Sequence, residues 1–163
     1  MAHDEWRFVP ARPADAEAMR TLARAAYEKY VPRIGAEPGP MLADYEAIAA
    51  SDRALLVWRN GELAAFLVTE LEPDALLIEN VAVSPAVQGA GLGSLLVAKA
   101  EDQATVAGKT MVRLYTHETM TENIDFYARR GFVETHRSTE HGFTRVFMSK
   151  QLDAPSDSST ASQ

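Results

Sequence analysis

The sequence contains no cysteine among its 163 residues. Disulfide bonds, thiolate zinc sites, iron–sulfur clusters and a cysteine nucleophile are therefore excluded. The sequence also lacks an apolar run long enough to span a bilayer, and its start shows no basic-then-apolar signal pattern. We therefore expect a cytoplasmic protein that has no membrane partner.

Basic residues are in deficit, with 16 Lys and Arg against 23 Asp and Glu, so the formal net charge is −7. An acidic chain is unsuited to sequence-independent binding of phosphate backbones, and we expect no nucleic-acid partner. The length and the hydrophobic share of 47% fit one globular domain, which we place at residues 1–152. Residues 153–163 are rich in Ser and nearly free of apolar side chains, which predicts a disordered tail.

Hydrophobic periodicity predicts an α/β domain with a central mixed sheet. Asn60-Gly61 and His141-Gly142 are expected at hairpin turns, and an irregular loop at 32–40. The apolar run at 75–83 is typical of a strand buried on both faces, and it begins a parallel crossover that ends near residue 115. Strands are expected at 6–10, 54–59, 62–71, 75–83, 110–115, 132–139 and 144–152, and helices at 13–30, 41–50, 92–107 and 122–130.

Three glycines, Gly89, Gly91 and Gly93, stand where a predicted strand gives way to a predicted helix. A helix N-terminus presents unpaired N–H groups and a partial positive charge, and glycines let the main chain approach a ligand closely. The combination suits a phosphate or a pyrophosphate. The alternative is a glycine-rich turn that binds nothing.

Two nucleotide-binding motifs do not fit this cluster. A dinucleotide fingerprint that begins at Gly89 would need a glycine where Ser94 stands, and it would usually open the fold. A mononucleotide loop that ends in Gly108-Lys109-Thr110 would need a glycine in place of Gln103, and this triplet follows a helix instead of opening one.

The pattern that remains is Gln88-x-x-Gly91-x-Gly93, which follows a strand ending in Asn80-Val81-Ala82-Val83. It resembles the [RQ]-x-x-G-x-[GA] signature of the GNAT superfamily of N-acetyltransferases. Phe126-Tyr127 and Gly131-Phe132 are similar to the family's second segment in register, although Met120 occupies the place of its asparagine and Asn123 lies closer to the tyrosine. The resemblance, from about residue 5 to 152, implies a single-domain GNAT-like fold. Its sheet would be mixed, mostly antiparallel and six- to seven-stranded, with about four flanking helices.

The resemblance also implies acetyl-coenzyme A (acetyl-CoA) as the donor. Main-chain N–H groups from Gln88 to Gly93 would hold the pyrophosphate, the main chain of Val81 and Val83 would pair with the pantetheine arm, and Asn123 would reach that arm. The implied cofactor-binding set is Val81, Ala82, Val83, Gln88, Gly89, Ala90, Gly91, Leu92, Gly93, Ser94, Asn123 and Tyr127.

Tyr127 matches the family's tyrosine, which is expected to protonate the departing thiolate. Strand alternation places Glu79 on one face with Val81 and Val83, where its carboxylate is a candidate general base for the acceptor amine. The alternatives are a salt-bridged Glu79 and His117 as the base. Because no cysteine can carry the acetyl group, the resemblance implies direct attack by a primary amine in a ternary complex.

In this family the first helix, the loop after it and the second helix form the wall on the acceptor side. The candidate acceptor contacts are Tyr30, Arg33, Met41, Tyr45 and His117. The acceptor would be a small-molecule amine or a peptide, and a homodimer is plausible for the family. No His–carboxylate spacing suggests a metal site. A non-catalytic acyl-CoA sensor and a nucleotide-binding protein remain alternative functions.

Overall fold

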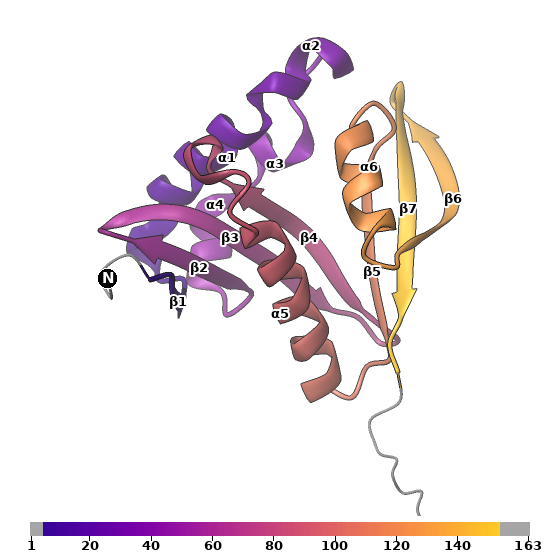
Figure 1. Ribbon diagram of the computed structural model, residues 1–163. Helices are drawn as coiled ribbons and strands as arrows, with labels where there is room; N and C mark the ends of the chain where they lie inside the picture. Colours follow the sequence, from indigo (N-terminus) through magenta and orange to yellow (C-terminus); the bar gives the residue numbers. More distant parts are fainter. Residues whose placement is uncertain (1–4, 154–163) are drawn as a thin grey trace, which may run out of the picture. The chain divides into compact units, whose positions relative to one another are not determined.

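The computed structural model describes residues 5–153, which fold as an α/β domain around a mixed seven-stranded sheet (Figure 1). The strand order is β1-β2-β3-β4-β5-β7-β6. The β4–β5 pair is parallel, whereas the β1–β2, β2–β3, β5–β7 and β6–β7 pairs are antiparallel. The strands are β1 (Arg7–Pro10), β2 (Ala54–Arg59), β3 (Glu62–Leu71), β4 (Leu76–Val83), β5 (Met111–His117), β6 (Val133–Glu140) and β7 (Phe143–Gln151).

Four helices have six residues or more in the described part of the chain, as predicted: α1 (Ala16–Tyr27), α4 (Tyr45–Ala50), α5 (Leu92–Val106) and α6 (Thr121–Ala128). Two single-turn helices, α2 (Val31–Ile34) and α3 (Gly39–Leu42), lie between α1 and α4. Short 3-10 turns cover Pro13–Asp15, Glu28–Tyr30 and Pro85–Val87. None of the helices within residues 5–153 is long and apolar enough to cross a membrane.

The chain divides into two compact units, which we describe separately. Within the described residues, unit 1 comprises 5–69 and 79–97, and unit 2 comprises 70–78 and 98–153. The apolar stripe of α1 in unit 1 is buried as the helical spacing predicts, together with the inner strand β3. Buried residues of these two elements include Met19, Leu22, Ala23, Phe66, Leu67 and Val68.

In unit 2, β5 and β7 each bury every second side chain, as strand alternation requires. The buried positions are Val112, Leu114 and Thr116 in β5 and Val146 and Met148 in β7. The side chains between them are half-buried or exposed, so one face of this part of the sheet is buried and the other is partly exposed.

Both predicted hairpins are confirmed by their turn geometry. Asn60 and Gly61 have φ of 55° and 80°, and His141 and Gly142 have φ of 53° and 81°. Positive φ at both central positions gives the tight turn whose twist matches that of the flanking strands.

Four local expectations need correction. Residues 31–34 are helical and not irregular, because Pro32 lies in the first turn of α2, where its missing N–H is not needed. The helix expected at 41–50 is divided into α3 and α4 at Ala43-Asp44, since the Asp44 carboxylate accepts the N–H of Ala47 and begins α4.

The burial of β4 and the length of β5 also differ from expectation. In β4 only alternate side chains are buried, and Leu77, Glu79, Val81 and Val83 are half-buried. Strand β5 continues to His117, which therefore ends the strand and does not follow it. The predicted tail, apart from Asp153, lies outside the described residues.

Candidate functional site

The glycine-rich loop of unit 1 joins β4 to α5. Gly89 and Gly91 have φ of 92° and 85°, backbone angles that residues other than glycine rarely adopt. The N–H of Ala90 donates to the carbonyl of Val87 (3.3 Å), and the N–H of Leu95 donates to that of Gly91 (3.1 Å). The second bond begins the helical ladder, and the N–H groups in the first turn of a helix lack the usual acceptor four residues earlier in the chain.

The mouth of this loop is open. A Cβ atom built on Gly89 or Gly91 would meet nothing within 4 Å, and residues 88–91 are exposed. Helix α5 is 15 residues long and has no acidic residue in its first turn. An exposed, uncrowded N-terminus of a long helix, free of a competing carboxylate, fits the diphosphate of coenzyme A.

The half-buried face of β4 carries Glu79. Its carboxylate forms an ion pair with Arg53, which lies between α4 and β2 in the same unit. The distance from Arg53 Nη1 to Glu79 Oε2 is 2.9 Å, and the two side chains are 32% and 26% exposed. The remaining exposure leaves the Glu79 carboxylate accessible to water. Both descriptions of Glu79 from the sequence, an ion-paired strand residue and a candidate base, are compatible with this geometry.

A buried polar network connects β4 to the helical side of unit 1. The Tyr27 hydroxyl lies 2.7 Å from Asn80 Oδ1 and 2.9 Å from the Val81 carbonyl, and the Asn80 amide donates to the Tyr45 hydroxyl (3.1 Å). Tyr45 in turn donates to the carbonyl of Pro40. Sequence reasoning missed Asn80, although a polar side chain at an inward position of an apolar strand is a usable signal.

The structure assigns most of the predicted acceptor wall to the core. Tyr30, Met41 and Tyr45 are buried, and Tyr45 has no exposed surface. Burial raises the pKa of Tyr45 to about 12, partly opposed by its hydrogen bond from Asn80. An acceptor cannot contact Tyr45 directly in this conformation. Arg33 is exposed and lies over the ring of Tyr30, at 5.1 Å from the centroid.

Tyr127 lies in α6 of unit 2, packed edge-on between the rings of Phe126 and Phe132, with centroid distances of 5.0 and 5.5 Å. The residue is 7% exposed, and burial raises the pKa of its phenol far above the usual value of about 10. Among residues 5–153, its hydroxyl has no hydrogen-bond partner, whereas every buried side-chain oxygen or nitrogen has one. The hydroxyl is therefore the exposed tip of an otherwise buried, protonated phenol.

Asn123 and Met120 clarify the shifted motif. Asn123 is half-buried in the first turn of α6, and its N–H donates to the carbonyl of Met120 (3.0 Å). The Met120 side chain is buried, with its sulfur 3.6 Å from the Thr116 hydroxyl. An apolar core residue thus occupies the place where the family pattern has an asparagine.

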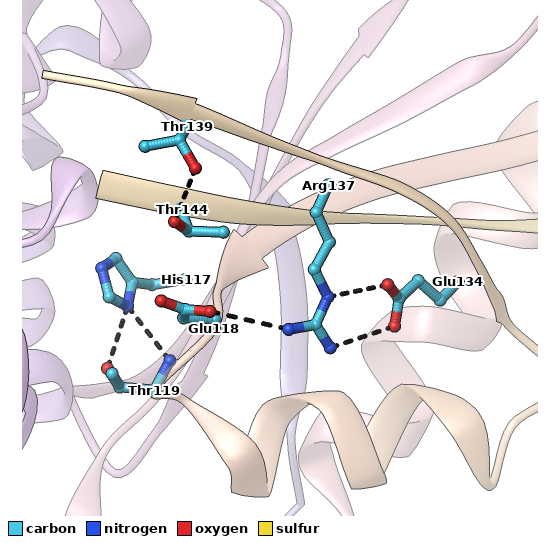
Figure 2. Close-up of polar contacts among 7 residues, drawn as sticks. All are labelled: His117, Glu118, Thr119, Glu134, Arg137, Thr139 and Thr144. Carbon is cyan, nitrogen blue, oxygen red and sulfur yellow. Dashed lines mark hydrogen bonds and ion pairs between the residues drawn. The ribbon is translucent and has the colours of Figure 1, made fainter. Parts of the chain in front are cut away.

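His117 ends β5 and is held by the next turn of the chain (Figure 2). Its Nδ1 accepts the main-chain N–H of Thr119 (3.1 Å) and lies 2.9 Å from the Thr119 hydroxyl. Because a main-chain N–H can only donate, Nδ1 carries no proton and the neutral ring is protonated at Nε2. His117 therefore presents a hydrogen-bond donor at Nε2, which disfavours it as the base and favours Glu79.

Residues 16–132 match the family model of the acetyltransferase (GNAT) family. The chain belongs to this family. GNAT enzymes transfer an acetyl group from acetyl-CoA, so the sequence resemblance and the donor that it implies are confirmed. No curated protein matches the sequence significantly.

Several solved structures share this fold. The PaiA N-acetyltransferase of Thermoplasma acidophilum, in complex with coenzyme A, is 15% identical over 91% of this chain and 99% of that chain, with a TM-score of 0.72. YncA of Salmonella typhimurium, a putative acetyltransferase with its cofactor acetyl-CoA, is 21% identical over 94% and 97%, with a TM-score of 0.69. The ribosomal-protein alanine N-acetyltransferase of Escherichia coli is 20% identical over 94% and 97%, with a TM-score of 0.73.

Proposed function

We propose that this GNAT protein is an N-acetyltransferase, which transfers the acetyl group of acetyl-CoA to a primary amine by direct attack. The observation that carries the proposal is the open glycine-rich loop at the N-terminus of α5, which can hold a diphosphate. When bound, acetyl-CoA supplies an activated acetyl thioester. The main-chain N–H groups of residues 88–93 would hold its diphosphate, and the main chain of Val81 and Val83 would bind its pantetheine arm.

Glu79 is the proposed general base. An amine must lose a proton to become a nucleophile, and a partly exposed carboxylate can take that proton through water. Arg53 holds the carboxylate at 2.9 Å, so it is a positioning residue. No metal-ligand cluster of three or more His, Asp or Glu occurs among residues 5–153, and the proposal uses none.

Tyr127 is the proposed proton donor to the leaving thiolate, and Asn123 is a proposed further contact of the pantetheine arm. A general acid must be protonated at the working pH, and burial keeps the phenol of Tyr127 in that form. Its hydroxyl makes no hydrogen bond within residues 5–153 and is free to donate to a ligand.

The proposal is tested by two measurements on the whole chain. Acetyl-CoA at concentrations well above its Kd should raise the melting temperature, because it binds only the folded state. Free thiol should then be released when a panel of primary amines is added. Absence of a thermal shift at millimolar acetyl-CoA would refute the loop as its binding site. A clear shift without thiol release from any amine would instead favour an acyl-CoA sensor.

A further inference from the structure

A side-chain hydroxyl of unit 1 contacts the strand that the proposed function assigns to the donor. Tyr27 is the last residue of α1, and its hydroxyl lies 2.9 Å from the carbonyl oxygen of Val81 in β4. Helical spacing places Tyr27 on the buried stripe of α1, together with Ala16, Met19 and Ala23. Tyr27 is only 7% exposed. The main chain of β4 is therefore in contact with a buried hydroxyl group whose position is set by a helix.

The hydrogen bonds of Tyr45 determine how the amide group of Asn80 is oriented. The Tyr45 hydroxyl donates its proton to the carbonyl of Pro40, because a carbonyl can only accept. Burial raises the pKa of Tyr45 to about 12, so this proton stays in place. The Tyr45 oxygen is then an acceptor, and the Asn80 atom that faces it at 3.1 Å is the amide nitrogen. The amide oxygen of Asn80 therefore faces the Tyr27 hydroxyl, at 2.7 Å.

The Tyr27 hydroxyl has one proton, and it faces two acceptor oxygens, Oδ1 of Asn80 and the carbonyl of Val81. Asn80 is 8% exposed and Tyr45 has no exposed surface, so water has little access to these groups. A buried hydroxyl that turned away from either oxygen would weaken a hydrogen bond that water cannot replace. The hydroxyl therefore stays between the two oxygens, and the Val81 carbonyl is held in one direction.

The chain between Val81 and the glycine-rich loop is also held at its other end. The N–H of Ser84 donates to the carbonyl of Ala64 in β3 (2.8 Å), and the Ser84 hydroxyl accepts the N–H of Ala86 (3.2 Å). The segment 81–84 is thus fixed by Tyr27 at its start and by Ala64 at its end. This segment leads directly into the loop that is proposed to hold the diphosphate.

We propose that Tyr27 is a positioning residue for the donor, and that its hydroxyl holds the Val81 carbonyl in the direction that the pantetheine arm of acetyl-CoA requires. The inference rests on the proposed function, in which the main chain of Val81 and Val83 binds that arm. The amide groups of the arm pair with a strand as an added strand would, through main-chain hydrogen bonds. Such bonds need carbonyl groups of fixed direction, and groups that are fixed before the ligand arrives increase its affinity.

The test compares two variants and two ligands. Tyr27→Phe removes the hydroxyl that contacts Val81, whereas the matched control Tyr45→Phe removes the hydroxyl on the other side of Asn80 and leaves the Val81 contact in place. Coenzyme A carries both the diphosphate and the pantetheine arm, whereas its nucleotide fragment, phosphoadenosine diphosphate, carries the diphosphate without the arm. The Kd of each ligand is measured by isothermal titration calorimetry on the whole chain.

We expect Tyr27→Phe to raise the Kd of coenzyme A by about threefold to tenfold, the usual effect of one hydrogen bond, and to leave the Kd of the nucleotide fragment unchanged. Tyr45→Phe should change neither Kd by more than about twofold, although it also removes a buried hydroxyl bonded to Asn80. In turnover, the KM for acetyl-CoA should rise in Tyr27→Phe together with the Kd. The kcat at saturating acetyl-CoA should stay at the wild-type value, because a positioning residue does not contact the reacting atoms.

The two proposals fail in different ways. The positioning role is overturned by an unchanged or lower Kd of coenzyme A in Tyr27→Phe, by equal weakening in the two variants, or by equal weakening of the two ligands in Tyr27→Phe. In each of these cases the wild type binds coenzyme A, and N-acetyl transfer stands. Absence of thiol release with every amine would refute N-acetyl transfer, and the Kd values would still decide the role of Tyr27. A wild type that bound neither ligand would refute both proposals.

Discussion

The hydroxyl of Tyr27 in α1 lies 2.7 Å from Oδ1 of Asn80 in β4. The Asn80 amide reaches on to Tyr45 at the start of α4, so one buried side chain ties two helices to the strand. The Tyr27 hydroxyl is also 2.9 Å from the carbonyl of Val81, whose main chain is proposed to bind the pantetheine arm. The network therefore fixes the strand where the donor is expected to lie.

We predict that this network contributes measurably to stability. Asn80→Ala should lower the free energy of unfolding by about 1–3 kcal/mol, because the buried hydroxyls of Tyr27 and Tyr45 lose a partner. Tyr27→Phe should cost about 1 kcal/mol. Denaturant unfolding of both single variants and the double variant should give a coupling energy of about 0.5–3 kcal/mol. Strict additivity would mean that the two side chains act independently.

A second prediction concerns Gly91, whose φ is 85° and whose surroundings are open. Gly91→Val should remove the thermal shift given by acetyl-CoA, because the side chain would project into the main-chain cradle and strain the loop. The matched control is Gly108→Val, since Gly108 also has a positive φ, 78°, and nothing within 4 Å. Both variants should lose basal stability, but only the control should keep the shift. If Gly91→Val retained the thermal shift, the diphosphate would have to bind at another site.

Much of the fold follows from local signals in the sequence. Asn60-Gly61 and His141-Gly142 each require positive φ, so the hairpins and the strands beside them could be placed closely. The prediction of a loop at Pro32 was wrong, because proline disrupts the interior of a helix but is tolerated in its first turn. Pro32 lies in the first turn of α2, which begins at Val31. Local signals in the sequence do not show where a new helix begins after the previous one has ended.

The sequence alone did not show which residues far apart in the chain would contact each other in the folded protein. Glu79 could be placed on the correct face of β4, but its partner Arg53 lies far away in the sequence and shares no motif with it. Tyr45 looked like a binding residue because aromatic side chains serve both cores and pockets, and only burial separates the two roles. The tautomer of His117 depends on a main-chain N–H two residues later, which is a consequence of the turn.

A third prediction tests Glu79 as the base. Glu79→Gln should lower kcat by about a hundredfold or more, since general-base catalysis contributes that much, while the acetyl-CoA thermal shift persists. The matched control is Glu72→Gln. Glu72 is paired with Arg113 at 2.9 Å and is 29% exposed, so the variant removes a similar ion pair, while Arg113 keeps Asp74 as a second partner at 3.1 Å. Equal activity of the two variants would leave Glu79 with a structural role only.

The last prediction concerns Tyr127 as the acid. Tyr127→Phe should reduce kcat by about a hundredfold, with little change in the acetyl-CoA shift, because only the proton donor is lost. The hydroxyl has no hydrogen-bond partner within residues 5–153, so its removal should cost less than about 1 kcal/mol of stability. Normal turnover in this variant would exclude the phenol from the mechanism.

The pH dependence gives an independent check on Tyr127. Burial raises the pKa of the phenol, and the protonated form is the one that donates. Activity lost through phenol ionisation should therefore begin only above pH 10 or so, the range in which an exposed tyrosine ionises. A pH–kcat profile of the wild type that fell with an apparent pKa near 9, and lost that limb in Tyr127→Phe, would show instead that the phenol ionises easily. That result would contradict the raised pKa on which its role as a persistent acid depends.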